Sequence, residues 1–154
     1  MSVEVGHAAP DFTLKDQAGN DVSLADYKGK QPVVLVFYPF TFTGVCQGEL
    51  CEIRDDPSTF ESADAAVLAI SCDTRHAQAQ WAEQQGFTFP VLSDFWPHGE
   101  VAKAYGVFNE KLGCANRASF VIDKEGKVVA TFASANLATP RSREEYESAL
   151  AGVS

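Results

Sequence analysis

Cysteines are the side chains of this 154-residue chain with the greatest potential for chemistry, and there are four: Cys46, Cys51, Cys72 and Cys114. A cysteine attacks other molecules as its thiolate, and a free thiol with a pKa of about 8.5 is only a few per cent ionised at pH 7. A reactive cysteine therefore needs neighbours that stabilise the negative charge. Most cysteines lack them and pack as small buried hydrophobic side chains, which is what we expect of Cys72 and Cys114.

Cys46 has the best position for such stabilisation. Val33–Phe37 is a continuous apolar run, typical of a strand covered on both faces, and Thr43 is suited to be the N-cap of a helix that extends to about Asp56. Cys46 then lies in the first helical turn, where free N–H groups and the helix dipole supply about 0.3–2 kcal/mol. Lowering a thiol pKa to about 6 takes roughly 3.4 kcal/mol. The remainder requires a nearby cation, so we expect an arginine partner.

A family resemblance supplies that arginine. The segment from Pro39 to Cys46 has the form P-x-x-x-T-x-x-C and resembles the active-site motif of the peroxiredoxin family. Residues 44–50 and 93–99 are most similar to its alkyl hydroperoxide reductase E subgroup. Further segments fit the family in the same order, so the resemblance covers nearly the whole chain: 9–14, 89–94, 101–106 and 117–123.

The resemblance implies one thioredoxin-like α/β domain over residues 1–154, with a mixed central sheet flanked by helices. It implies an active site of Pro39, Thr43, Cys46 and Arg117, and a thiol-specific peroxidase with no cofactor and no metal. Cys46 would attack hydrogen peroxide, an organic hydroperoxide or peroxynitrite and become a sulfenic acid. Arg117, the Thr43 hydroxyl and backbone N–H groups would hold the developing charge, while Pro39 would stiffen the loop and limit water access.

The resemblance also implies partners. These are a peroxide substrate, a second subunit in a homodimer, and a thiol reductant of the mycothiol and mycoredoxin type or a thioredoxin. The composition argues against a nucleic-acid-binding protein, because 12 basic and 21 acidic residues give a net charge of -9, which repels a polyanion. The longest apolar stretch is far shorter than the roughly 20 residues that span a bilayer, and no secretory signal is visible. We therefore expect a cytoplasmic protein, whose thiols are mostly reduced.

Cys51 has two interpretations. Its spacing of five residues from Cys46 is that of the resolving cysteine in peroxiredoxins of the Q type, whereas one-cysteine members lack it. On an intact helix two such Cα atoms are roughly 8.7 Å apart, and a disulfide tolerates at most about 7 Å. A bond between Cys46 and Cys51 therefore requires local unwinding. The alternative is an inert, packed cysteine with an external thiol as the reductant.

Two further classes of function are considered. A thioredoxin-like disulfide exchanger or binding module would have the same fold, but it would be expected to show C-x-x-C after the first buried strand. A zinc protein would use Cys46, Cys51, Cys72 and His76, although their spacing is loose and a closed metal site would block the thiolate.

The rest of the pattern predicts the elements that hold these residues. Turn residues, caps and hydrophobic periodicity define them. In order, we expect a hairpin of 11–14 and 22–24, a strand at 65–70, a helix from Thr74 to Gly86, a strand at 89–92, a helix at 101–105, paired strands at 119–123 and 128–132, and a helix at 143–150.

Overall fold

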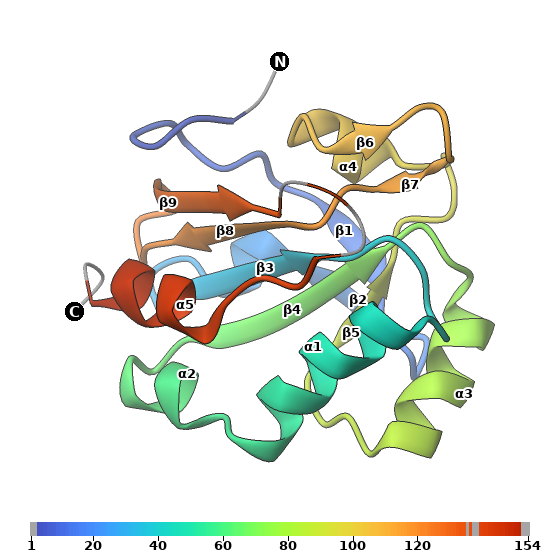
Figure 1. Cartoon of the computed structure of the whole chain (residues 1–154). Coiled ribbons are helices and arrows are strands. Elements are labelled where there is room, and N and C mark those ends of the chain that lie inside the picture. Colours follow the sequence, from blue (N-terminus) through green and yellow to red (C-terminus); the bar gives the residue numbers. More distant parts are fainter. Residues whose placement is uncertain (1–2, 135, 137–138, 152–154) are drawn as a thin grey trace.

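The computed structural model describes residues 3–134, 136 and 139–151. A seven-stranded mixed sheet runs through the molecule in the order β2-β1-β5-β4-β3-β8-β9 (Figure 1). Its strands are β1 (Thr13–Lys15), β2 (Asp21–Ser23), β3 (Val33–Phe37), β4 (Ala66–Ser71), β5 (Val91–Ser93), β8 (Ala118–Ile122) and β9 (Val128–Ala133). β3, β4 and β5 are parallel, and the other pairs are antiparallel. The predicted mixed sheet is confirmed.

Helices cover both faces of this sheet. They are α1 (Gly44–Asp55), α2 (Ser58–Ser62), α3 (Arg75–Gln85), α4 (Glu100–Ala104) and α5 (Arg143–Leu150), with a 3₁₀ turn, η1 (Leu24–Asp26). α1, α2, α3 and α5 lie on one side of the sheet, and α4 lies on the other beside a two-stranded ribbon of β6 (Phe108–Asn109) and β7 (Cys114–Ala115) (Figure 1). Within the described part of the chain, no helix is long and apolar enough to cross a membrane.

β3 is the centre of both hydrophobic layers. All five of its residues are buried, as its continuous apolar sequence predicted. Side chains alternate across a strand, so Val34 packs with Leu50 of α1 and Trp81 of α3, while Leu35 packs on the opposite face with Tyr105. A strand fixed on both faces is a rigid base for the loop that follows it.

Most of the predicted elements form with small shifts at their ends. The Thr74 hydroxyl caps α3 by accepting the Ala77 N–H at 3.2 Å, and Gly86 ends that helix with a left-handed φ of 69°. The strand predicted at 89–92 lies instead at Val91–Ser93. α2 and the β6–β7 ribbon were not predicted.

Candidate active site

The loop after β3 places Cys46 at one end of the sheet. Pro39 and Thr41 are buried and Phe40 and Phe42 are exposed, and the chain then reaches Thr43, the N-cap residue of α1. Cys46 is in the first turn of α1 and only 1% exposed. The first-turn N–H groups of Val45 and Cys46 have no carbonyl partner within the helix, so they present positive partial charge near the sulfur.

Strand pairing brings Arg117 to the same place. β8 is antiparallel to β3 and pairs Ala118 with Phe37, so the residue before β8 lies beside the end of β3. Arg117 Nη2 donates a hydrogen bond to Cys46 Sγ at 3.2 Å across 71 residues of sequence, and the arginine is 3% exposed. The arginine partner expected for Cys46 is therefore in contact with it.

Thr43 also lies where the sequence placed it, but its hydroxyl has a different role from the one expected of a cap. The side chain makes no capping hydrogen bond to α1. Its Oγ1 instead donates to the Phe40 carbonyl at 2.6 Å. Because a threonine hydroxyl carries one hydrogen, the Thr43 oxygen can take part in further hydrogen bonds only as an acceptor.

A buried carboxylate and a second arginine complete the site, and sequence reasoning missed both. Glu49 forms an ion pair with Arg117 Nη1, while its two oxygens accept from Arg141 N at 2.6 Å, Nε at 2.9 Å and Nη2 at 2.8 Å. Arg141 Nη1 also donates to the carbonyls of Phe37 (2.6 Å) and Ala118 (2.8 Å), where β3 meets β8.

The cluster beside Cys46 carries excess positive charge. Glu49, Arg117 and Arg141 are each at most 7% exposed. Two guanidinium groups and one carboxylate leave an excess of one positive charge among these three side chains. Burial acts to raise the pKa of Glu49, but the hydrogen bonds and charges of Arg141, with the charge of Arg117, outweigh it and hold that pKa below its ordinary value.

Glu49 had one signal in the sequence. It lies three residues after Cys46, which places the two side chains on the same side of a helix. Arg141 had none, because its contact with Glu49 spans 92 residues.

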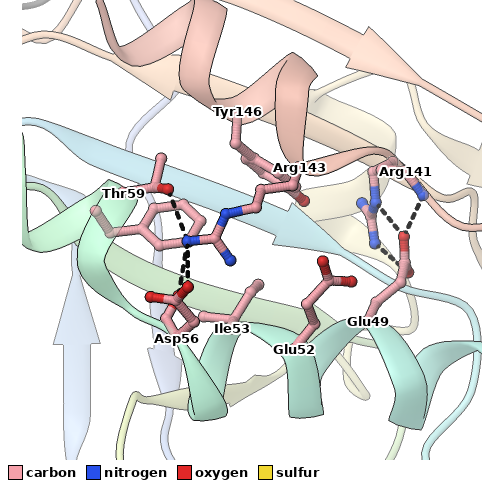
Figure 2. Close-up of a pocket in the computed structure, with 9 residues that line it drawn as sticks. Glu49, Glu52, Ile53, Asp56, Thr59, Arg141, Arg143 and Tyr146 are labelled. Atoms are coloured by element: carbon pink, nitrogen blue, oxygen red, sulfur yellow. Dashed lines mark hydrogen bonds and ion pairs between the residues drawn. The ribbon is translucent and has the colours of Figure 1, made fainter.

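Arg141 lies two residues before α5, and contacts of that helix with α1 fix this part of the chain. Figure 2 shows the groove between α1 and α5, with Glu49 and Arg141 at one end, and with the Arg143 side chain reaching toward Asp56 and Thr59 at the other. Arg143, the first residue of α5, bonds to Asp56 Oδ2 at 3.1 Å and to Thr59 Oγ1 at 3.0 Å. The start of α5 is thereby attached to the end of α1, two residues after Arg141.

Cys51 lies on the same unbroken helix as Cys46. It is half-buried, and its Sγ donates to Gln85 Oε1 of α3 at 3.5 Å. The intact helix confirms the premise that a Cys46–Cys51 bond requires unwinding of α1.

The other two cysteines are buried and protonated. Burial is the largest cause of a pKa of about 12 for the Cys72 thiol and about 11 for Cys114. As for zinc, the residues that the structure describes contain no group of three or more histidine, cysteine, aspartate or glutamate side chains that could hold a metal ion.

Comparison with known proteins agrees with this geometry. Residues 5–131 match the model of the AhpC/TSA family. The chain is 56% identical over 124 residues to alkyl hydroperoxide reductase E of Mycobacterium tuberculosis, covering 80% of this chain and 81% of that one. It is 35% identical to peroxiredoxin Bcp of Bacillus subtilis over 84% of each chain. Its structure is similar to the crystal structure of peroxidoxin BcpB from Mycobacterium tuberculosis, with a TM-score of 0.83, 35% identity and coverage of 97% and 95%.

Proposed function

This chain belongs to the AhpC/TSA family and is a peroxiredoxin, a thiol-dependent peroxidase that acts on peroxides; on that premise we propose that Cys46 is the sulfur that attacks the peroxide. The observation that carries the proposal is the 3.2 Å hydrogen bond from Arg117 Nη2 to Cys46 Sγ. It belongs to a buried cluster with excess positive charge, at the N-terminus of a helix.

The proposed reaction forms a sulfur–oxygen bond and breaks the O–O bond. The Cys46 thiolate attacks one peroxide oxygen in line with the O–O bond and becomes a sulfenic acid. The other oxygen leaves with the bonding electrons, takes a proton and departs as water or an alcohol. Charge develops on that oxygen, and Arg117 Nη2 can donate to it while Nη1 stays on Glu49.

Thr43 would orient the substrate. Its single hydroxyl hydrogen is used in the bond to Phe40, so its oxygen can accept the hydrogen of the peroxide O–H. Pro39 is the buried first residue of the loop and has no N–H. It therefore adds stiffness without adding a donor that would compete for the substrate.

We propose further that Cys51 resolves the sulfenic acid. Its Sγ is half-buried and makes one long hydrogen bond to a side chain, so it is the cysteine most easily released from its surroundings. The Cys51 thiol would attack Cys46 sulfur, water would leave, and a disulfide would form. Unwinding the first turns of α1 also withdraws Glu49 from its two arginines, so the disulfide form lacks the cluster that activates Cys46.

The resolving role predicts a specific disulfide. After one equivalent of hydrogen peroxide, mass spectrometry of the wild-type protein should find Cys46 linked to Cys51, because the two lie on one helix that can open from its N-terminus. The Cys51→Ser variant should keep the sulfenic acid. The matched Cys114→Ser variant should form the same disulfide as wild type. A persistent Cys46 sulfenic acid beside a free Cys51 in the wild-type protein would show that an external thiol acts directly.

The remaining partners complete the proposal. A thiol reductant of the mycothiol and mycoredoxin type or a thioredoxin would return Cys46 to its thiol, and the chain would act as a homodimer. The support for both is the resemblance of residues 44–50 and 93–99 to the alkyl hydroperoxide reductase E subgroup.

A further inference from the structure

The loop that carries Thr43 has a backbone that its own sequence does not favour. Phe42, the residue before Thr43, has a φ of 67°, in the left-handed region that bulky side chains rarely adopt. Phe42 is half-exposed, and its ring lies 6.3 Å from that of Trp81 in α3, centroid to centroid. A backbone conformation of this kind persists only where surrounding contacts hold it.

Asp73, in the segment that follows β4, makes one such contact. It lies two residues after the end of β4, and its Oδ2 accepts the backbone N–H of Thr41 at 2.8 Å. The bond is to the main chain, directly before Phe42, and the carboxylate makes it a charge-assisted bond. The Thr41 hydroxyl bonds to Tyr38 Oη at 2.9 Å, and both residues are buried. The loop is thus fixed at its middle and at its base.

Besides its bond to Thr41, Asp73 makes hydrogen bonds that fix it to the end of the sheet. Ser71 Oγ donates to the same Oδ2 at 2.7 Å, and Ser93 Oγ of β5 donates to the Asp73 carbonyl at 2.6 Å. The fully buried Gln78 of α3 donates to Ser71 Oγ at 2.9 Å and to the Leu92 carbonyl at 2.8 Å. β4, β5 and α3 therefore set the position of the carboxylate, and the loop follows it.

We infer that Asp73 is a positioning residue for the peroxide reaction, which holds the Pro39–Thr43 loop so that Thr43 and the first turn of α1 face the substrate together. The inference rests on the proposed function. Asp73 acts through Thr41 and does not itself touch the reacting atoms. Cys46 Sγ accepts its hydrogen bond from Arg117, the residue before β8, and Arg117 is held by Glu49 of α1. Neither contact involves Asp73. Loss of Asp73 therefore disturbs peroxide orientation and spares the thiolate.

The positioning role of Asp73 is tested by comparing two reactions of Cys46, oxidation by peroxide and alkylation. In Asp73→Ala, the second-order rate constant for Cys46 oxidation by hydrogen peroxide should fall by about 10- to 100-fold, because small errors in reactant orientation have effects of this size. The rate of Cys46 alkylation by iodoacetamide at pH 7 should change by less than about threefold, since alkylation needs the thiolate but not the loop. Stopped-flow fluorescence and mass spectrometry of the alkylated Cys46 peptide measure the two rates.

Two further variants sharpen the experiment. Asp73→Asn keeps the size and one acceptor oxygen but not the charge, so it should lie between Asp73→Ala and wild type. If circular dichroism shows that Asp73→Ala is unfolded, the oxidation and alkylation rates of Asp73→Asn test the positioning role instead. Asp16→Ala is the matched control, since Asp16 accepts two backbone N–H groups at 2.9 Å in the exposed turn between β1 and β2, and it should react like wild type.

The outcomes separate this inference from the proposed function. If wild-type Cys46 is not oxidised at all, the proposed function fails. If wild type reacts and both Asp73 variants match it within threefold, only the positioning role fails. An equal fall of the oxidation and alkylation rates would also overturn that role, because it would place the effect of Asp73 on the thiolate or on the fold.

Discussion

Replacing Arg117 with lysine is expected to lower the second-order rate constant for peroxide by roughly 10²- to 10³-fold, the cost of losing one preorganised donor to a developing oxyanion. Arg117 uses two nitrogens at once, with Nη1 on Glu49 and Nη2 on Cys46 Sγ. A lysine keeps the charge but ends in a single nitrogen on a flexible stem, so it cannot bridge both partners in a fixed geometry.

Stopped-flow oxidation of Arg117→Lys with hydrogen peroxide measures this effect. The control is Arg75→Lys, the same substitution at the start of α3, which should react at the wild-type rate. Turnover of Arg117→Lys within threefold of wild type would contradict the role assigned to the guanidinium fork.

Replacing Glu49 with glutamine is expected to lower the free energy of unfolding at pH 7 by about 3–5 kcal/mol, the range for removing one partner of a buried ion pair. Glutamine has nearly the same shape, but it removes the carboxylate charge that pairs with Arg117 and Arg141, which are 3% and 5% exposed. Urea unfolding followed by circular dichroism measures the change. Glu52→Gln, at an exposed position on the next turn of α1, should stay within about 0.5 kcal/mol of wild type.

The effect of Glu49 should also depend on pH with a definite sign. The pKa of Glu49 is lower in the folded protein than its ordinary value of 4.5. Its ionisation therefore contributes stability that is fully present above about pH 4.5 and is lost as the pH falls through the lowered pKa. The difference in unfolding free energy between wild type and Glu49→Gln should be constant from pH 7 to about pH 5 and shrink below that. Equal stability of the two proteins at pH 7 would contradict the buried network.

Local patterns in the sequence predicted the parts of the fold that short-range physics determines. The uniformly apolar Val33–Phe37 became a fully buried strand, and Thr74 and Gly86 became the two caps of α3. The short β6–β7 ribbon was missed because each of its strands has two residues, too few for a period to be visible. The ends of several strands shifted by one or two residues, because the end of a strand depends on its partner strand.

The site residues also fall into those that local sequence predicts and those that it does not. Cys46 and Thr43 were predicted because the motif P-x-x-x-T-x-x-C and the expected start of a helix fall in the same few residues of sequence. Arg117 was expected from the need for a cation and from the family resemblance, but its 3.2 Å contact needed the pairing of β8 with β3. Arg141 and Asp73 act through main-chain or buried polar contacts 92 and 32 residues apart in sequence. No periodicity or spacing marks such contacts, so only the folded structure shows them.

Site-resolved trapping of the sulfenic acid tests the central claim most directly. The Cys51→Ser protein, which keeps Cys46, Cys72 and Cys114, should be treated with half an equivalent of hydrogen peroxide in the presence of dimedone and mapped by mass spectrometry. We predict that the adduct lies on Cys46 and that Cys72 and Cys114 stay unmodified, because burial keeps those two thiols protonated. An adduct on Cys72 or Cys114, or consumption of peroxide with no adduct on Cys46, would contradict the assignment of Cys46 as the nucleophile.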